Sequence, residues 1–340
     1  MIRNDASDLF FFGYLAGRPM KGDGSTSIAI VYHILSRFLS FTGAIADIHI
    51  KFLFPIKIIN LMRVSLMSQM KRLLLLLSLM ANSKISGISK GSLFWNWILL
   101  KIKFLGGLKG PKPQISLFGK KFCGLDQSSL NYLFEEIFLK GEYIFKSTKA
   151  EPVIFDCGSN IGMGILFFKI IYPNAKITGF EANPEVFEIL KTNISNLNMN
   201  DIQVHHLALY DQDTEITFYT GNSSESLLGS INSNRGGKKA VLVKAKKLSE
   251  FLKTHSEIDL IKIDVEGAEW NIIQDLVQSS SLRKCHQYLI EFHLNLPELE
   301  GKLSEFLEYF EAQGYLYNIR GDFGRVGEFQ DLLIQCIRKD

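Results

Sequence analysis

The sequence predicts an α/β protein with a doubly wound, mostly parallel β-sheet, preceded by a basic N-terminal extension. From Val153 onward, short apolar strand patterns alternate with helical patterns. This alternation is typical of right-handed crossovers, which place helices on both faces of a parallel sheet. Near the C-terminus two strand patterns follow each other with no room for a helix between them. They predict an antiparallel hairpin at one edge of the sheet.

Residues 1–115 form the expected extension, which we predict to be poorly defined or helical. A stretch rich in Gly, Pro and Lys, Gly106 to Gln114, is the expected linker. Residues 1–124 contain 17 Lys and Arg against 4 Asp and Glu, whereas residues 125–340 contain 21 against 31. Such an asymmetry indicates that the basic part contacts an anionic surface, or that a leader is basic without such a role. The run from Leu93 to Leu108 fits a helix at a membrane interface or one packed on the next domain.

The chain is expected to be cytoplasmic, with a peripheral contact to the anionic inner face of the membrane through residues 1–115. No stretch reaches the roughly 20 apolar residues of a transmembrane helix, and the longest run, Leu73 to Ala81, is too short. The four cysteines lie far apart without a CxxC pair, a pattern typical of reduced thiols in the cytosol.

Residues 125–340 form the predicted main domain, with its core over residues 150–316. A helical pattern capped by Ser128 or Ser129 opens it. The expected strands are Val153–Phe155, Lys176–Phe180, Ile202–Leu207, Leu260–Asp264 and Tyr288–Phe292, then the hairpin from Gly314–Gly321 and Asp331–Arg338. The clearest helices are Gly162–Ile171 and Pro184–Leu197.

The first strand ends on Asp156, and Gly158, Ser159, Asn160 and Gly162 follow at once. Ligands of doubly wound sheets bind at the carboxyl ends of the strands. A glycine lets the backbone turn there and approach a ligand closely. A nucleoside with a cationic, amino-acid-like tail suits this loop, with the carboxylate facing the positive end and backbone N–H groups facing a negative group.

The second strand ends on Glu181, 23 residues after Gly158. An acid at this offset accepts hydrogen bonds from ribose hydroxyls. The loop lacks the second glycine of the G-x-G-x-x-G fingerprint, because Asn160 stands there. A nucleoside site is therefore favoured over a dinucleotide site.

Three segments, "VIFDCGSNIG", "GFEANPEVFEILKTN" and "DLIKIDVEGAEWNII", resemble the FkbM family of S-adenosylmethionine-dependent methyltransferases. The resemblance runs from about Phe134 to Cys336, and Lys262 to Glu269 is its most distinctive part. It implies a class I methyltransferase fold with strand order 3-2-1-4-5-7-6 and strand 7 antiparallel. The implied cofactor is S-adenosylmethionine, bound by Asp156, Gly158, Ser159, Asn160, Gly162, Glu181, Ala182, Asn183, Leu207, Ala208, Asp264 and Glu266.

The candidate catalytic residues are Asp264, Glu291 and His293, which stand with Glu266 at the ends of the fourth and fifth strands. Residues two apart on a strand share a face. We expect His293 to act as a base on an acceptor hydroxyl, with Glu291 orienting its ring. A divalent cation held by these groups is the less favoured alternative. Glu266 could instead only cap the helix that begins near Gly267.

The expected function is O-methylation of a hydroxyl on a glycan, lipid-linked saccharide or secondary metabolite, the acceptors that the resemblance implies. The alternative is an inactive methyltransferase fold that serves at a membrane surface or as a scaffold. No nucleic-acid partner is expected, because "DVEGAE" stands where base-methylating enzymes carry [DNS]-P-P-[YFW]. The basic run Arg235–Lys247 also lacks the interleaved aromatic residues of a single-strand platform, and reads as a solvated strand.

Overall fold

The computed structural model describes residues 74–79, 85, 87–105, 112–221, 229–231, 237–294, 301–322, 324 and 327–339. The chain divides into two compact units, Met1–Leu77 and Ser78–Asp340, and the second unit contains the elements described below. This unit begins before residue 115, where the sequence predicts the end of the extension. Most of that extension, and most of the expected linker, lie outside the described residues. None of the described helices is long and apolar enough to cross a membrane.

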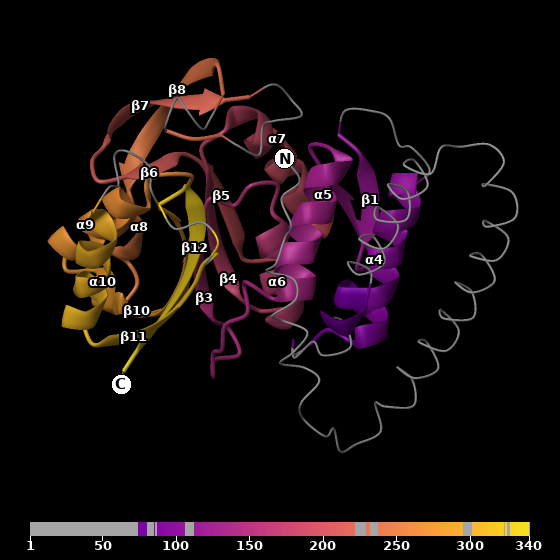
Figure 1. Cartoon of the computed structure of the whole chain (residues 1–340), viewed down its shortest axis with the longest axis horizontal. Helices are drawn as coiled ribbons and strands as arrows, with labels where there is room; N and C mark the ends of the chain where they lie inside the picture. The colour runs from indigo at the N-terminus through magenta and orange to yellow at the C-terminus, as the bar shows by residue number, and fades with distance from the viewer. Residues whose placement is uncertain are drawn as a thin grey trace, which may run out of the picture. The chain divides into compact units, whose positions relative to one another are not determined.

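A seven-stranded sheet forms the centre of the second unit (Figure 1). Its strands are β3 (Val153–Cys157), β4 (Lys176–Glu181), β5 (Ile202–His206), β9 (Ile258–Ile263), β10 (Cys285–Leu294), β11 (Tyr315–Arg320) and β12 (Gln330–Arg338). They lie in the order β5-β4-β3-β9-β10-β12-β11, parallel from β5 to β10, with β12 antiparallel to both neighbours. Both the class I methyltransferase topology and the edge hairpin expected from the sequence are confirmed.

Helices cover both faces of this sheet (Figure 1). One face carries α6 (Met163–Ile171) and α7 (Pro184–Leu197), and the other carries α8 (Leu248–Leu252), α9 (Glu269–Gln278) and α10 (Lys302–Ala312). A 3-10 turn, η3 (Leu282–Lys284), precedes β10. The two clearest helices expected from the sequence are thus present.

Several elements of the second unit precede the sheet in sequence. They are α4 (Lys90–Leu105), the hairpin of β1 (Gln114–Leu117) and β2 (Lys120–Cys123), α5 (Gln127–Phe134) and the π-helix η1 (Glu135–Lys140). The buried side chain of Asn193 joins this hairpin to α7: it accepts from the Cys123 N–H at 2.7 Å and donates to the carbonyls of Cys123 and Ile161, each at 2.8 Å. The cap of α5 is Asp126, which accepts from the Ser129 N–H, so the serine cap expected from the sequence is wrong.

A smaller, three-stranded sheet lies beside the main one, and the sequence did not predict it as a sheet. Its order is β6-β8-β7, formed by β6 (Ala208–Tyr210), β8 (Lys239–Lys247) and β7 (Thr214–Thr220). Figure 1 shows it above one end of the main sheet. The strand expected within the basic run is β8, which exposes alternate residues to solvent. This sheet supplies one wall of the site described below.

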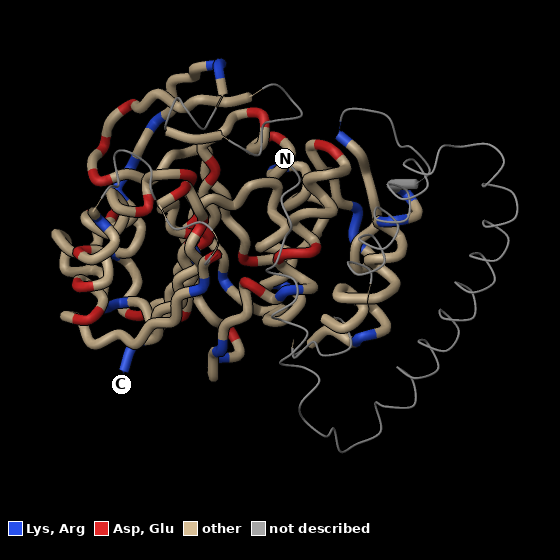
Figure 2. Tube along the Cα trace, in the orientation of Figure 1, with Lys and Arg blue, Asp and Glu red and all other residues tan. Residues whose placement is uncertain are grey.

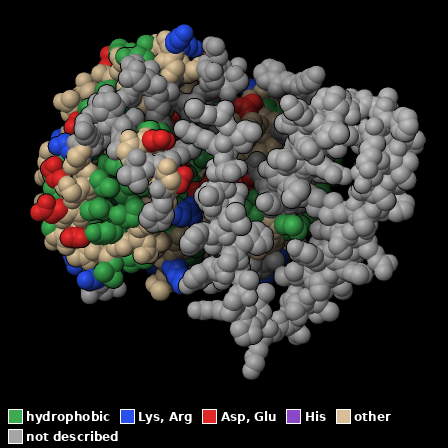
Figure 3. All heavy atoms as spheres, in the orientation of Figure 1, with side chains coloured by type: hydrophobic (Ala, Val, Ile, Leu, Met, Phe, Trp, Pro, Cys, Tyr) green, Lys and Arg blue, Asp and Glu red, His purple; other side chains and the backbone are tan. Residues whose placement is uncertain are grey.

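Charge and exposed apolar area are distributed unevenly over the second unit. Figure 2 shows acidic residues gathered where β10 and β12 lie in Figure 1. Figure 3 shows hydrophobic side chains on the side that carries α10 and the edge strands. Leu316 on β11 and its cross-strand partner Ile337 on β12 are exposed. In contrast, β9 is buried along its whole length, including Lys262. A buried lysine needs partners of opposite charge, and these lie at the candidate site.

Candidate active site

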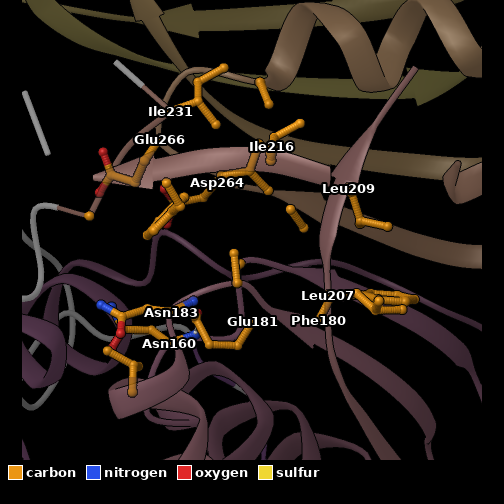
Figure 4. A pocket seen from close by; sticks show the side chains of 18 residues that line it. Asn160, Phe180, Glu181, Asn183, Leu207, Leu209, Ile216, Ile231, Asp264 and Glu266 are labelled. Atoms are coloured by element: carbon orange, nitrogen blue, oxygen red, sulfur yellow. Dashed lines mark hydrogen bonds between the residues drawn. The ribbon is translucent and has the colours of Figure 1, made fainter. Parts of the chain in front are cut away.

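A cleft of about 660 Å³, open to solvent, lies between the main sheet and the small sheet (Figure 4). Figure 4 shows Asp264, Glu266 and Ile231 on one side of the cleft, and Asn160 and Glu181 on the other. The residues expected at a cofactor site that line this cleft are Gly158, Asn160, Glu181, Ala182, Asn183, Leu207, Ala208, Asp264 and Glu266.

The loop after β3 depends on Gly158. Its φ is 85°, and a Cβ at this position would lie 1.7 Å from the carbonyl oxygen of Asp264. Only glycine therefore lets the loop pack against the end of β9. The N–H groups of Gly158 and Ser159 both donate to the carbonyl of Phe180, at 3.0 and 2.8 Å. The expectation that these N–H groups face a negative ligand group is wrong, because both already donate to a carbonyl of β4.

Glu181 has both carboxylate oxygens held by backbone N–H groups. Oε2 accepts from Asn160 at 2.9 Å and Oε1 accepts from Asn183 at 2.8 Å. Burial raises the pKa of Glu181 to about 7, although these two hydrogen bonds lower it. The carboxylate is thereby fixed at the edge of the cleft, and its remaining lone pairs could accept from two neighbouring hydroxyl groups.

The rest of this end of the cleft is mainly apolar. Leu207 and Ala208 line it as expected, and the small sheet adds Ile216 and Phe218. The side chain of Asn183 caps α7 through its oxygen, while its buried Nδ2 has no hydrogen-bond partner among the described residues. An apolar slot beside an unused amide donor suits a flat heterocycle with nitrogen acceptors.

Asp156 does not line the cleft, and the expected contact with a positive cofactor group is not supported. The side chain is buried beneath the loop, where Lys262 Nζ lies 3.6 Å from Asp156 Oδ1 and 3.2 Å from Asp264 Oδ2. The same Nζ donates to the carbonyl of Gly158 at 2.7 Å. Lys262 therefore holds the two acids and the glycine loop together. The sequence signal for it was a basic residue between apolar residues of a predicted buried strand.

Glu269 organises the turn after β9. This fully buried carboxylate accepts at Oε1 from the N–H groups of Val265 and Gly267, at 3.3 and 3.0 Å. The same oxygen lies 2.8 Å from His293 Nδ1. Glu266 occupies a left-handed conformation with φ 60° and provides no side-chain cap for α9, whose first flanking residue is Ala268. The capping role considered for Glu266 is therefore wrong.

An acidic cluster surrounds the other nitrogen of His293. From Nε2, the nearest carboxylate oxygens of Glu266, Glu291 and Asp331 lie at 3.2, 3.8 and 3.7 Å. Asp264 belongs to the same cluster, within 4.8 Å of Glu266 and His293. Asp264 and Glu266 also line the cleft, so the cleft and the cluster share a wall. The expected catalytic residues are thus brought together at one end of the cleft.

The geometry changes two of the roles expected at this cluster. Glu269, not Glu291, orients the ring, because Glu269 lies 2.8 Å from Nδ1, within hydrogen-bond distance, whereas Glu291 lies 3.8 Å from Nε2. Burial favours the neutral ring, but the charges of Glu269 and Glu266 outweigh it and raise the pKa of His293 well above its usual range. The charge of Asp264, and burial after it, raise the pKa of Glu291 well above the usual range. A protonated His293 is not a base, so the simple base role does not fit the ligand-free protein.

Two further loop residues act in the framework rather than in the cleft lining. Ser159 is buried and its Oγ donates to the carbonyl of Asp156 at 2.9 Å. Gly162, with φ 87°, begins α6. The β7 residues in the cleft wall, Ile216 and Phe218, carried no sequence signal, because their position depends on how β7 pairs with β8 rather than on a motif.

A family model described as the Methyltransferase FkbM domain matches residues 156–317. Methyltransferase 1 of Beauveria bassiana is 30% identical over 167 residues, which cover 43% of this chain and 67% of that protein. The 31-O-demethyl-FK506 methyltransferase FkbM of Streptomyces tacrolimicus is 23% identical over 229 residues, covering 58% of this chain and 86% of that protein. The crystal structure of a methyltransferase FkbM from Methylobacillus flagellatus matches with a TM-score of 0.41 at 14% identity, over 58% of this chain and 46% of that chain.

Proposed function

Because this chain belongs to the FkbM methyltransferase family, we propose that it transfers a methyl group from S-adenosylmethionine to an acceptor hydroxyl. The acceptor class is a glycan, a lipid-linked saccharide or a secondary metabolite. The name of the Streptomyces relative, a 31-O-demethyl-FK506 methyltransferase, describes methylation of an oxygen atom, which supports a hydroxyl acceptor. The observation that carries the proposal is Glu181, held at both oxygens at the edge of the cleft.

The residues of the cleft fit this cofactor part by part. Glu181 would accept from both ribose hydroxyls, and the apolar slot with the amide of Asn183 would hold the adenine. The amino-acid end would then extend toward Asp264 and Glu266, whose negative charge suits its ammonium group. When bound, S-adenosylmethionine supplies an electrophilic methyl group on a sulfonium.

The chain's own contribution is alignment and removal of a proton. An acceptor hydroxyl at the shared wall would donate to the carboxylate of Asp264, which is proposed to take its proton as the new bond forms. His293, fixed by Glu269, would hold this group of acids in place. The alternative, an inactive fold at a membrane surface or a scaffold, is less well supported, because the cleft keeps the acids that a cofactor requires.

Calorimetry with S-adenosylhomocysteine tests the proposal directly. Glu181→Gln should weaken binding by about 10- to 100-fold, since charged hydrogen bonds contribute about 1.5–3 kcal/mol. Glu185→Gln is the matched control, because this exposed acid follows in the same segment and pairs with Lys239 on the surface. Equal affinity in both variants, or preference for NAD over S-adenosylhomocysteine, would contradict the proposal. Turnover of a hydroxylated acceptor would separate it from the inactive alternative.

The place of the reaction in the cell is also a proposal. The four cysteines are free and buried, which fits a reducing compartment such as the cytoplasm. We also propose a peripheral contact with anionic lipid through the N-terminal part of the chain. A vesicle-binding experiment on the exposed side of α4 tests this contact.

A further inference from the structure

The acidic cluster next to the cleft brings four carboxylates around one histidine nitrogen. Asp264, Glu266 and His293 offer ligand atoms that all lie within 4.8 Å of one another, and so do Glu291, His293 and Asp331. The two groups meet at His293. Like charges this close repel each other, so the cluster favours a positive charge among them. Lys262, a buried cation that pairs with Asp264, is also engaged by Asp156 and the glycine loop.

The environment of His293 is a second observation that indicates a bound ion. Its side chain is 0% exposed, and Nε2 has no hydrogen-bond partner among the described residues. That nitrogen is aimed into the cluster, with carboxylate oxygens at 3.2 to 3.8 Å. On the opposite side of the ring, Glu269 lies 2.8 Å from Nδ1. A carboxylate on one ring nitrogen, with the other nitrogen facing an ion, is the usual arrangement of metal-binding histidines.

We propose that Asp264, Glu266 and His293 bind a divalent cation, with Glu291 and Asp331 completing the site. A donor set of one imidazole and several carboxylates suits Mn²⁺ and neighbouring first-row ions better than Mg²⁺, which prefers oxygen donors alone. The carboxylates are partly exposed, with Asp331 the most accessible, so the ion can enter from solvent. Their negative charges attract it electrostatically.

The cation would act on the acceptor at the wall shared with the cleft. The binding of the cation does not depend on methyl transfer, whereas the role of the cation in catalysis rests on the proposed function. An acceptor hydroxyl coordinated to the ion would have a lowered pKa. Its oxygen then forms a bond with the methyl carbon, the carbon–sulfur bond breaks with its electron pair on sulfur, and the hydroxyl proton passes to a carboxylate of the cluster.

The test measures ion binding by the full chain after chelator treatment. Titration with MnCl₂, followed by calorimetry and by the electron paramagnetic resonance of free Mn²⁺, should show one ion per chain. His293→Gln and Asp331→Asn should each weaken binding. Glu269→Gln, which keeps the oxygen that holds the turn but removes the charge behind the ring, should weaken it by about 10- to 100-fold.

The matched control is His286→Gln on the same strand. His286 also pairs with a carboxylate, Glu257, at 2.7 Å, but lies at the opposite end of β10. Its substitution should leave Mn²⁺ affinity unchanged. Binding of S-adenosylhomocysteine by each variant reports whether the domain is folded.

The outcomes separate the two proposals. Wild-type protein that binds S-adenosylhomocysteine but no Mn²⁺ would overturn the cation site and leave the proposed function standing. Mn²⁺ binding that is unchanged in folded His293→Gln would likewise overturn the site. Mn²⁺ binding without any S-adenosylhomocysteine binding would support the site and contradict the proposed function instead.

Discussion

Burial changes the acidity of Glu181. Its pKa is about 7 in the ligand-free cleft, above the ordinary carboxyl value of 4.5. Only the charged form accepts hydrogen bonds from both hydroxyls of a ribose. Affinity for S-adenosylhomocysteine should therefore rise as the pH passes upward through 7, and fall below it.

Calorimetry should show an affinity about tenfold higher at pH 8 than at pH 6, because the charged fraction of a carboxyl group with a pKa of about 7 rises about tenfold between these two pH values. In Glu181→Gln the pH dependence should disappear along with part of the affinity. A wild-type affinity that is constant over this range would show that another group controls binding.

Lys262 pairs with Asp156, a buried acid that would otherwise have no partner of opposite charge among the described residues. In Lys262→Met, Asp156 loses its neighbouring positive charge, and breaking a buried pair in this way costs about 3–5 kcal/mol. Urea unfolding should show this loss. The double variant Lys262→Met/Asp156→Asn should recover part of it, because the unpaired charge is gone. A single variant as stable as the wild type would mean that Asp156 is neutral in the native protein.

At the scale of elements, α4 presents two different apolar faces. Leu93, Trp97 and Leu100 are buried, whereas Trp95, Leu99 and Ile102 are 64%, 43% and 59% exposed, a spacing that places them on one side of the helix. Packing on the domain, one of the two roles considered for this segment, is therefore confirmed. The exposed side keeps the second role, contact with a membrane interface, as a prediction.

Flotation with vesicles containing anionic lipid tests this contact. Trp95→Gln should reduce the fraction of protein that floats, and high salt should reduce it further by screening the basic residues. Leu242→Gln is the matched control, because Leu242 is 65% exposed but lies on β8 in the small sheet. Equal flotation on neutral and anionic lipid would contradict an electrostatic contribution.

At the scale of the molecule, the boundary of the folded domain decides which part of the chain folds alone. Residues 78–340 form one compact unit, and Asn193 joins its first hairpin to α7. A chain of residues 78–340 should unfold cooperatively and bind S-adenosylhomocysteine like the full protein.

A chain of residues 125–340 should be markedly less stable. It lacks the hairpin and α4, which exposes apolar core, and Asn193 loses its partners at Cys123, at about 1–3 kcal/mol for each buried polar group left unpaired. Thermal unfolding of the two chains gives the comparison. Equal stability would place the boundary at the position that the sequence indicated.

The sequence by itself determined the sheet, the edge hairpin and the position of Glu181. Alternating strand and helix patterns require a parallel sheet, and the carboxyl ends of its strands meet at one edge. Acids at the strand ends must therefore lie near one another, which is why Asp264, Glu291 and His293 were expected together. These conclusions follow from local periodicity and chain direction. Both can be read from the residues of one segment without knowledge of its neighbours in space.

Only the tertiary structure decided which groups face the ligand. Asp156 pairs with Lys262 outside the cleft lining. The N–H groups of Gly158 and Ser159 donate to the carbonyl of Phe180, and Glu269 rather than Glu291 orients His293. The small sheet that walls the cleft likewise depends on the pairing of β7 with β8. A buried charge or N–H group takes its role from the partner that lies nearest in space, and strands distant in the sequence supply that partner only after the chain has folded.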